Sequence, residues 1–243
     1  MKPVRRIEPT EWMRAAPTRA VVAALCADGQ EIRFVGGCVR DTLLGDFTGR
    51  DIDIATPDIP ETVIALLDKA GIRNIPTGLA HGTITAVAEG QHFEITTLRV
   101  DVKSHGRHAD VAFTDVWQED AARRDFTMNA LTCTPEGEIY DPCDGIEDLE
   151  AGCVRFVGDA EQRIAEDHLR LLRFFRFHAW YGRGAPDSTG LAAAAGGAKL
   201  LSKLSGERIR NEMFKLLAAP DPAAVIDIMA ETGVLGEIVP GAN

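Results

Sequence analysis

The stretch RFVGGCVRDTLLGDFTGRDIDIATPD, residues 33–58, decides the fold of the first part of this 243-residue chain. An apolar run ends at Gly36 and Gly37, a short amphipathic run follows, and two aspartates then alternate with isoleucines over residues 51–54. This order predicts a strand, a glycine turn, a helix and a second strand. Glycines between a strand and a helix let backbone N–H groups approach phosphate oxygens. The stretch therefore indicates a site for a triphosphate and a metal ion.

The overall composition is that of an ordinary globular protein of one or two domains, with 45% hydrophobic and 26% charged residues. No apolar run approaches the ~20 residues that span a bilayer. The first residues of the chain lack the apolar segment of a secretory signal. The five cysteines are scattered and form no CxxC pair. We therefore expect reduced thiols, a cytoplasmic location, no membrane partner and no disulfide-linked partner.

The net charge of −11 is unevenly distributed along the chain. Residues 1–158 hold 16 basic and 26 acidic side chains, whereas residues 159–243 hold 10 and 11. The excess of acidic side chains lies in the first part of the chain, where a metal site would need carboxylates. The later part carries five arginines between residues 163 and 183, which is compatible with binding of a polyanion there.

Hydrophobic patterns predict that the first ~140 residues are mixed α/β. We expect helices at residues 18–27, 61–70 and from 39 onward, and strands at residues 31–35 and 51–55. Two β-rich runs flank Glu89 and Gly90, which predicts a hairpin. Because the strands crowd together without regular crossover helices, we expect an α+β fold with a small mixed sheet and helices on one side.

The pattern becomes helical from about residue 159. Residues 160–181 contain neither Pro nor Gly, and Ser205 stands in N-cap position before a further helix. The Gly/Ala-rich residues 182–198 predict a mobile or weakly helical connection. We accordingly divide the chain into a domain of residues 1–140 and a helical domain of residues 141–243.

Three carboxylates form the candidate metal site. On a strand, Asp51 and Asp53 share one face about 6.6 Å apart, and Glu94 alternates with apolar neighbours in a later β-rich run. Adjacent carboxylates repel unless a divalent cation such as Mg²⁺ lies between them. Three of them suit two-metal nucleotidyl transfer. A lone DxD equally fits a polar strand face, and a lone Gly-Gly fits a turn without a ligand.

Two further segments carry groups suited to a nucleotide. ARRDFTMNAL, residues 121–130, contains arginines that suit phosphates and Asp and Asn side chains that suit ribose hydroxyls, although helix capping with surface ion pairs explains it equally well. In EDHLR, Asp167 and Arg170 are expected at i and i+3 on one helix face. An acceptor beside a guanidinium matches the edges of cytosine and adenine and disfavours uracil and guanine. The alternative is an intrahelical salt bridge worth only ~0.3–0.5 kcal/mol. Taken by itself, the EDHLR motif favours this alternative over base selection.

Six segments in order, VGGCVRDTLLG…RDIDIAT, FEITTLR, RRDFTMNAL, YDPCDGIEDL, EDHLRLLRFFRF and GERIRNEMFKLL, resemble the motifs of class II tRNA nucleotidyltransferases and bacterial poly(A) polymerases. The resemblance covers roughly residues 31–240. It implies a polymerase-β-like nucleotidyltransferase head, a helical neck and the start of a body. It also implies addition of nucleotides to an RNA 3′ end with two Mg²⁺ ions.

The resemblance implies a role for each matching residue. The triphosphate would contact Gly36, Gly37 and Arg40. Asp51 and Asp53 would hold the metal ions, with Glu94 as a further acidic residue at the catalytic site. Ribose and phosphate binding would fall to Arg123, Arg124, Asp125 and Asn129. Selection of CTP and ATP would fall to Glu166, Asp167 and Arg170. Glu207 and Arg208 would support the fold.

Within the family, EDHLRLLR resembles the CCA-adding branch, because poly(A) polymerases usually have Pro between this Asp and Arg. We therefore expect a tRNA 3′-terminal nucleotidyltransferase, with CC, A or CCA addition all open. A poly(A) polymerase and a non-catalytic RNA- or nucleotide-binding protein are the alternatives. Family members continue into regions that grip the tRNA, so we expect this chain to end before a tRNA-binding tail.

Overall fold

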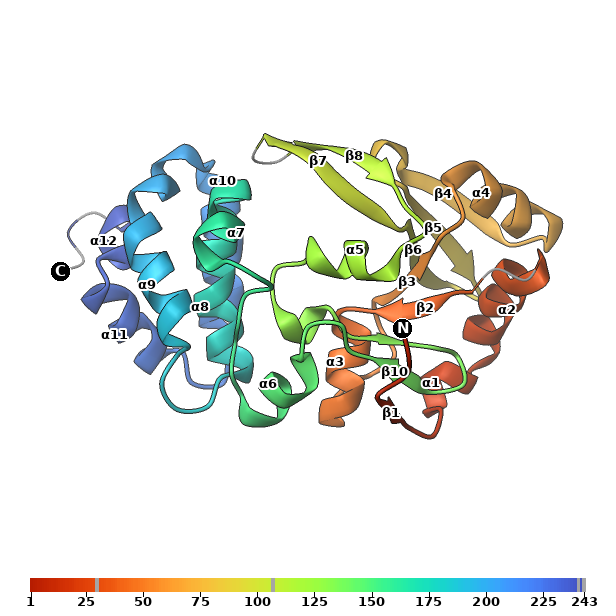
Figure 1. Cartoon of the computed structure of the whole chain (residues 1–243), viewed down its shortest axis with the longest axis horizontal. Helices are drawn as coiled ribbons and strands as arrows, with labels where there is room; N and C mark the ends of the chain where they lie inside the picture. The colour runs from red at the N-terminus through yellow and green to blue at the C-terminus, as the bar shows by residue number, and fades with distance from the viewer. Residues whose placement is uncertain (29–30, 106–107, 240, 242–243) are drawn as a thin grey trace. The chain divides into compact units, whose positions relative to one another are not determined.

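The computed structural model describes residues 1–28, 31–105, 108–239 and 241, which form two compact units (Figure 1). The first unit comprises Met1–Lys103, Asp110–Arg124 and Asn129–Gly145. The second comprises Ser104–Ala109, Asp125–Met128 and Ile146–Asn243.

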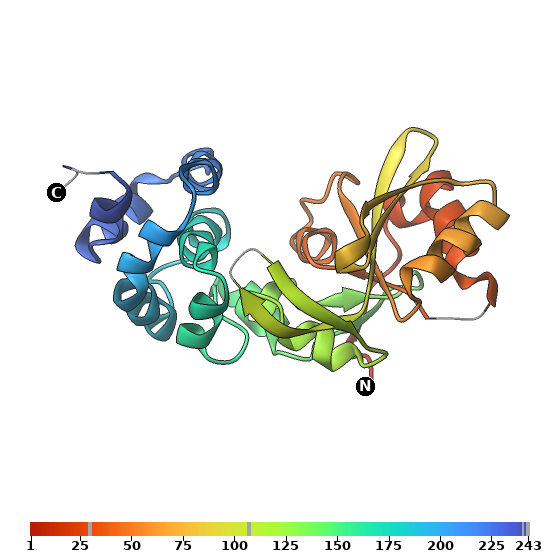
Figure 2. The same cartoon turned by 90° about the horizontal axis from the view of Figure 1, so that it is seen from above.

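An eight-stranded mixed sheet, in the order β1-β10-β9-β2-β3-β6-β5-β4, organises the first unit. β3 and β6 pair in parallel, and the other neighbours pair antiparallel. The strands are β1 (Arg5–Arg6), β2 (Arg33–Val35), β3 (Ile52–Thr56), β4 (Arg73–Gly78), β5 (Thr83–Ala88), β6 (Gln91–Thr97), β9 (Thr132–Cys133) and β10 (Glu138–Tyr140). β7 (Arg99–His105) and β8 (His108–Phe113) form a separate two-stranded sheet, drawn yellow-green in Figure 2. The predicted α+β class with a mixed sheet is confirmed.

The α-helices in the described residues of the first unit are α1 (Glu11–Arg14), α2 (Ala16–Leu25), α3 (Gly37–Leu44), α4 (Pro60–Lys69) and α5 (Trp117–Ala122). α2 and α4 pack against β5, and the isoleucines and phenylalanines of β2, β3, β5 and β6 are fully buried. The predicted hairpin joins β5 to β6. Glu89 and Gly90 both have positive φ, 51° and 81°, as a two-residue hairpin turn that follows the strand twist requires.

One prediction for this unit is wrong, because β3 begins at Ile52 and Asp51 lies outside the strand. Asp51 has a φ of 54°, and Gly49, two residues earlier, has a φ of 79°. The chain therefore turns into the strand through Asp51, so strand alternation does not place the carboxylates of Asp51 and Asp53 on one face.

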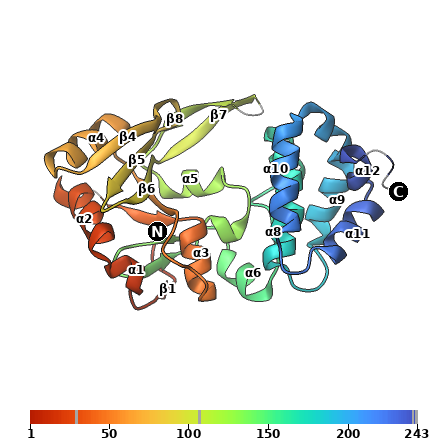
Figure 3. The ribbon, with the colours of Figure 1, turned by 180° about the vertical axis from the view of Figure 1, so that it is seen from behind.

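Helices build the second unit. They are α6 (Gly145–Ala151), which starts at the boundary, α7 (Ala160–Glu166), α8 (Leu169–Tyr181), α9 (Ser188–Gly197), α10 (Gly206–Leu217), α11 (Ala223–Glu231) and α12 (Val234–Ile238). α8 and α10 lie side by side (Figure 3). α8 supplies Phe174 and Phe177 to an aromatic core with Phe126 and Phe156, whose ring centroids lie 4.9 Å apart. Ser205 caps α10 through the N–H of Arg208, as predicted.

The single helical run expected over residues 160–181 is two helices, α7 and α8. Asp167, between them, has an extended backbone with φ −144° and ψ 107°. Its carboxylate accepts a hydrogen bond from the N–H of Leu169 at 3.1 Å, as a helix cap does. The expectation that Asp167 and Arg170 share one helix face is therefore wrong, because the helix is interrupted at Asp167.

The Gly/Ala-rich segment is a regular helix, α9, and not the mobile or weakly helical connection that its composition predicts. Asp187 caps it by accepting a hydrogen bond from the N–H of Gly190 at 2.7 Å. Two of its glycines face close neighbours, since a Cβ on Gly190 would lie 2.8 Å from the Phe174 ring and one on Gly197 would lie 3.2 Å from Ile164. Close packing on these glycines outweighs their low helix propensity.

None of the helices in the described part of the chain combines the length and the apolar composition that a membrane span needs. The five cysteines are unpaired in the structure, with Cys38 and Cys133 buried.

Two glycines of α9 should respond in opposite directions to replacement by alanine. Gly190→Ala should lower the free energy of unfolding by about 1–3 kcal/mol, because the new Cβ overlaps the Phe174 ring. Gly196→Ala should raise it by about 0.5–1 kcal/mol, since Gly196 is exposed and its Cβ would meet open space. Urea unfolding of both variants measures the difference, and equal effects would contradict the close packing of α9.

Candidate active site

The glycine turn between β2 and α3 lies against charged side chains of the first unit. Gly36 has φ 69° and ψ −128°, a conformation that L side chains rarely adopt. A Cβ on Gly36 would lie 3.4 Å from Nη1 of Arg124 and 3.9 Å from Oδ2 of Asp53. The start of α3, with its unpaired N–H groups, is therefore close to both a guanidinium and a carboxylate.

The parallel register of β3 and β6 places Asp53 directly opposite Glu94. Burial raises the pKa of Asp53 to about 6, and repulsion from Glu94 and Asp51 adds to the rise, while Arg124 opposes it. Asp51 and Glu94 thus both act on Asp53 through their charge, although both are exposed. A half-buried carboxylate that is repelled by two others favours either a proton or a cation.

The donor set fits a divalent cation that is completed by a substrate. Among the residues that the structure describes, no three His, Cys, Asp or Glu side chains form a ready-made metal site. Mg²⁺ is usually held by one or two carboxylates together with substrate phosphates and water. Asp51 and Asp53, beside a turn that offers N–H groups to phosphates, match that arrangement.

Sequence reasoning missed Asp120, which holds both arginines of the RRDFTMNAL segment. Its carboxylate lies 2.7 Å from Nη2 of Arg123 and 3.0 Å from Nη2 of Arg124. Burial would raise the pKa of Asp120, but the guanidinium groups of Arg124 and Arg123 outweigh burial and lower it. The spacing of i, i+3 and i+4, from Asp120 on α5 to the two residues that follow the helix, is a sequence signal for this pair of contacts.

Arg40 lies beneath the glycine turn and is 6% exposed. Its Nη1 donates a hydrogen bond to Oδ1 of Asn129 at 2.7 Å, and its Nε lies 2.8 Å from Oδ1 of Asp41. A Cβ on Gly37 would lie 3.6 Å from Nη2 of Arg40. The structure thus joins two predicted residues that are 89 positions apart, Arg40 and Asn129.

The other predicted residues lie in the second unit. Nε and Nη2 of Arg173 donate to Oδ2 of Asp125 at 2.7 and 2.5 Å. Glu166 accepts hydrogen bonds from Arg163 and Arg170, both at 2.6 Å.

The carboxylate of Asp167 pairs with Arg208 of α10. Nη2 of Arg208 lies 3.0 Å from one carboxylate oxygen and 2.9 Å from the other. The backbone N–H of Arg170 donates to the carbonyl of Asp167 at 2.9 Å, so both residues stand at the start of α8. The salt bridge of Asp167 is therefore made with α10 and not with Arg170.

Comparison with known proteins gives the family. Residues 32–155 match the family model described as "Poly A polymerase head domain", and residues 191–243 match "Probable RNA and SrmB- binding site of polymerase A". The chain belongs to the family of class II CCA tRNA nucleotidyltransferases and poly(A) polymerases, as its motifs predict.

Its relatives within this family include CCA-adding enzymes. The chain is 45% identical over 222 residues to human "CCA tRNA nucleotidyltransferase 1, mitochondrial", covering 89% of the chain and 50% of that protein. It is 42% identical over 223 residues to the "CCA-adding enzyme" of Geobacillus thermodenitrificans, covering 91% and 54%. The chain therefore spans about half the length of the curated relatives it matches.

A solved structure also matches this chain. The Bacillus stearothermophilus CCA-adding enzyme in complex with CTP has a TM-score of 0.84 and 37% sequence identity. The match covers 96% of this chain and 55% of that one. This likeness confirms the arrangement of a mixed-sheet head followed by helices.

Asp53→Asn should stabilise the fold in the absence of divalent ions. The pKa of Asp53 is about 6 in the folded protein and 3.8 is its ordinary value. The ionised carboxylate therefore weakens the fold at high pH, and this cost disappears as pH falls through 6 towards 4. Because each pKa unit corresponds to 1.36 kcal/mol and the pKa rises from 3.8 to about 6, we expect a gain of about 3 kcal/mol at pH 8.

Urea unfolding in EDTA between pH 5 and pH 8 measures this gain. Asp46→Asn, at an exposed aspartate of the same unit, is the matched control and should show no comparable gain. A gain for Asp53→Asn that is the same at both pH values would contradict the raised pKa.

Proposed function

We propose that this chain is the nucleotidyltransferase part of an enzyme that adds C, A or both to the 3′ end of tRNA from CTP and ATP. The observation that carries the proposal is the approach of the Gly36 turn to Asp53 and Arg124 within the first unit. It brings backbone N–H groups, a guanidinium and a half-buried carboxylate together, as a bound triphosphate and its cation require. The CCA-adding relatives support the choice of tRNA.

The proposed reaction joins the tRNA 3′-oxygen to the incoming nucleotide. The 3′-hydroxyl oxygen attacks the α-phosphorus, the hydroxyl proton is lost, and the bond from the α-phosphorus to the bridging oxygen breaks, so that pyrophosphate leaves. Backbone N–H groups at Gly36 and Gly37 bind the phosphates, and the guanidinium groups of Arg40 and Arg124 offset their charge.

Asp51 and Asp53 would hold two Mg²⁺ ions, with Glu94 beside them as a further acidic group. When bound, such ions lower the pKa of the attacking hydroxyl and neutralise charge on the leaving group. The raised pKa of Asp53 fits this role, because a carboxylate that is costly to ionise alone gains most from a cation.

Ribose and phosphate recognition is assigned to Arg123, Asp125 and Asn129 together with Arg124. The salt bridge to Arg173 fixes the Asp125 carboxylate, and Asp120 fixes both neighbouring arginines. Side chains held in this way lose little further rotamer entropy when a ligand binds.

Asp167, Arg170 and Glu166 would select the base. A carboxylate offers about four acceptor positions, so Asp167 can accept from the N4 amine of cytosine or the N6 amine of adenine while it keeps Arg208. Glu166 orients the guanidinium of Arg170 through a 2.6 Å hydrogen bond. The edges of uracil and guanine place a carbonyl oxygen against Asp167, which repels it.

The proposal is tested with Mg²⁺ and a tRNA that lacks its 3′ CCA, given each triphosphate alone and then CTP with ATP. We expect extension by a short fixed length that needs CTP first. Open-ended extension with ATP alone would instead identify a poly(A) polymerase.

Asp53→Ala should abolish extension with the fold retained, and turnover at the wild-type rate in that variant would refute the metal assignment. The cytoplasmic location stays a prediction.

Asp167→Ala should relax base choice, because the acceptor for the cytosine amine is lost. We expect the ratio of CTP to UTP incorporation to fall at least about tenfold, the equivalent of 1.4 kcal/mol. Asp187→Ala is the matched control, since Asp187 also caps a helix of the second unit and accepts a 2.7 Å hydrogen bond. It should cost about 1 kcal/mol of stability with no change in discrimination. Unchanged discrimination in Asp167→Ala would refute the role in base selection.

A further inference from the structure

Residues 45–50 join α3 to β3 and lead the chain into Asp51. Gly45 and Gly49 have φ values of 81° and 79°, and Asp51 has a φ of 54°. For a residue other than glycine, this backbone conformation costs about 1–3 kcal/mol and persists only where the surroundings impose it. The contacts that hold residues 45–50 therefore determine where the Asp51 carboxylate lies.

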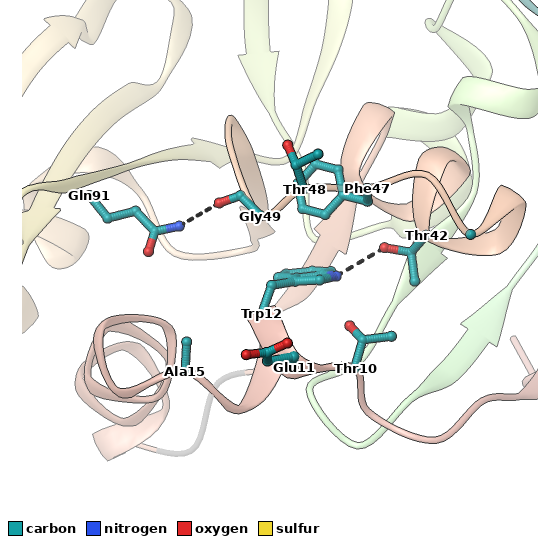
Figure 4. A pocket seen from close by; sticks show the side chains of 10 residues that line it. Thr10, Glu11, Trp12, Ala15, Thr42, Phe47, Thr48, Gly49 and Gln91 are labelled. Atoms are coloured by element: carbon teal, nitrogen blue, oxygen red, sulfur yellow. Dashed lines mark hydrogen bonds between the residues drawn. The ribbon is translucent and has the colours of Figure 1, made fainter.

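A cavity of about 510 Å³ borders this segment within the first unit (Figure 4). Phe47 and Gly49 of the segment line it, together with Trp12 of α1 and Gln91 of β6. Where a segment borders a cavity it has fewer packed neighbours, so its position depends on the specific contacts that it makes.

Gln91 makes a direct polar contact with the segment. Its Nε2 donates a hydrogen bond to the backbone carbonyl of Gly49 at 2.8 Å (Figure 4). Gln91 is the first residue of β6, the strand that pairs with β3 and carries Glu94. This hydrogen bond therefore ties the turn before Asp51 to the strand that lies beside Asp53.

Trp12 forms an apolar support for the same segment. Its ring packs edge-on against Phe47 with centroids 5.0 Å apart, and a Cβ on Gly49 would lie 3.2 Å from Cβ of Trp12. Its Nε1 donates to Oγ1 of Thr42 on α3 at 3.0 Å. Trp12 thus braces the segment against the helix that follows the glycine turn, and Gln91 fixes the direction of the backbone carbonyl at Gly49.

We propose that Gln91 is a positioning residue for Asp51. Its hydrogen bond to the Gly49 carbonyl sets the backbone turn that presents the Asp51 carboxylate to a divalent cation beside Asp53. This inference rests on the proposed function, in which Asp51 and Asp53 hold Mg²⁺. Gln91 acts through the backbone of Gly49.

The test measures binding of Mn²⁺ alone, without nucleotide or tRNA, from the electron paramagnetic resonance signal of the free ion. Gln91→Met keeps the length of the side chain and removes the donor, and should weaken Mn²⁺ binding about threefold to tenfold, the equivalent of one hydrogen bond. In the Asp51→Ala background the same substitution should cause no further loss. Thermal melting checks that each variant folds, and Gln91→Leu is a second variant of the same kind.

Asn74→Leu is the matched control. Asn74 also donates a side-chain amide hydrogen bond in the first unit, to Oδ1 of Asp68 at 2.8 Å, and it lies on β4. The Mn²⁺ affinity of the Asn74→Leu variant should equal that of the wild type. In turnover, Gln91→Met should raise the Mg²⁺ concentration needed for half-maximal activity, with KM for CTP unchanged at saturating Mg²⁺.

Two results overturn the inference alone: no loss of Mn²⁺ affinity in Gln91→Met, or an equal loss with and without Asp51. Unchanged Mn²⁺ affinity in Asp51→Ala is a different result. It overturns the metal assignment in the proposed function, and the inference with it.

Discussion

The parallel pairing of β3 with β6 sets Asp53 beside Glu94. The neighbouring groups of the first unit offset the electrostatic repulsion that this pairing creates. Two carboxylates on adjacent strands repel, and burial makes ionisation of Asp53 costlier still. Arg124 lies close enough to reduce that cost, and Asp120 holds Arg124 in place. The apolar neighbours of Asp53, Ile52 and Ile54, are fully buried and keep the strand from moving its charge into solvent.

This arrangement lowers the stability of the fold and favours the binding of a cation. A carboxylate with a raised pKa weakens the folded protein near neutral pH, yet the same electrostatic field attracts a cation. The glycine turn also depends on an unusual backbone conformation, since a side chain at Gly36 would be strained by the positive φ. The sharp backbone conformations at Gly36 and Asp51 both occur at this site, where strain is commonly retained for function.

The second unit uses a different principle, in which ion pairs orient polar side chains. Asp125 is paired with Arg173, Asp167 with Arg208, and Glu166 with Arg163 and Arg170. Each pair joins a residue of the proposed nucleotide site to a helix of the same unit. The paired side chains are only 11–30% exposed, and each pair restricts where its charged groups point.

The sequence alone determined the family and those elements that local patterns define. Periodicity and turn residues predicted the β5–β6 hairpin, α3, α4 and α10, because these depend on local backbone preferences and on alternating burial. Six ordered motifs were enough to indicate a nucleotidyltransferase. Only the tertiary structure decided that Asp51 lies outside β3, that Asp167 interrupts the helix, and that the Gly/Ala-rich segment is helical. These outcomes depend on contacts between distant residues, namely Gln91 with Gly49, Asp167 with Arg208 and Gly190 with Phe174, which local patterns do not encode.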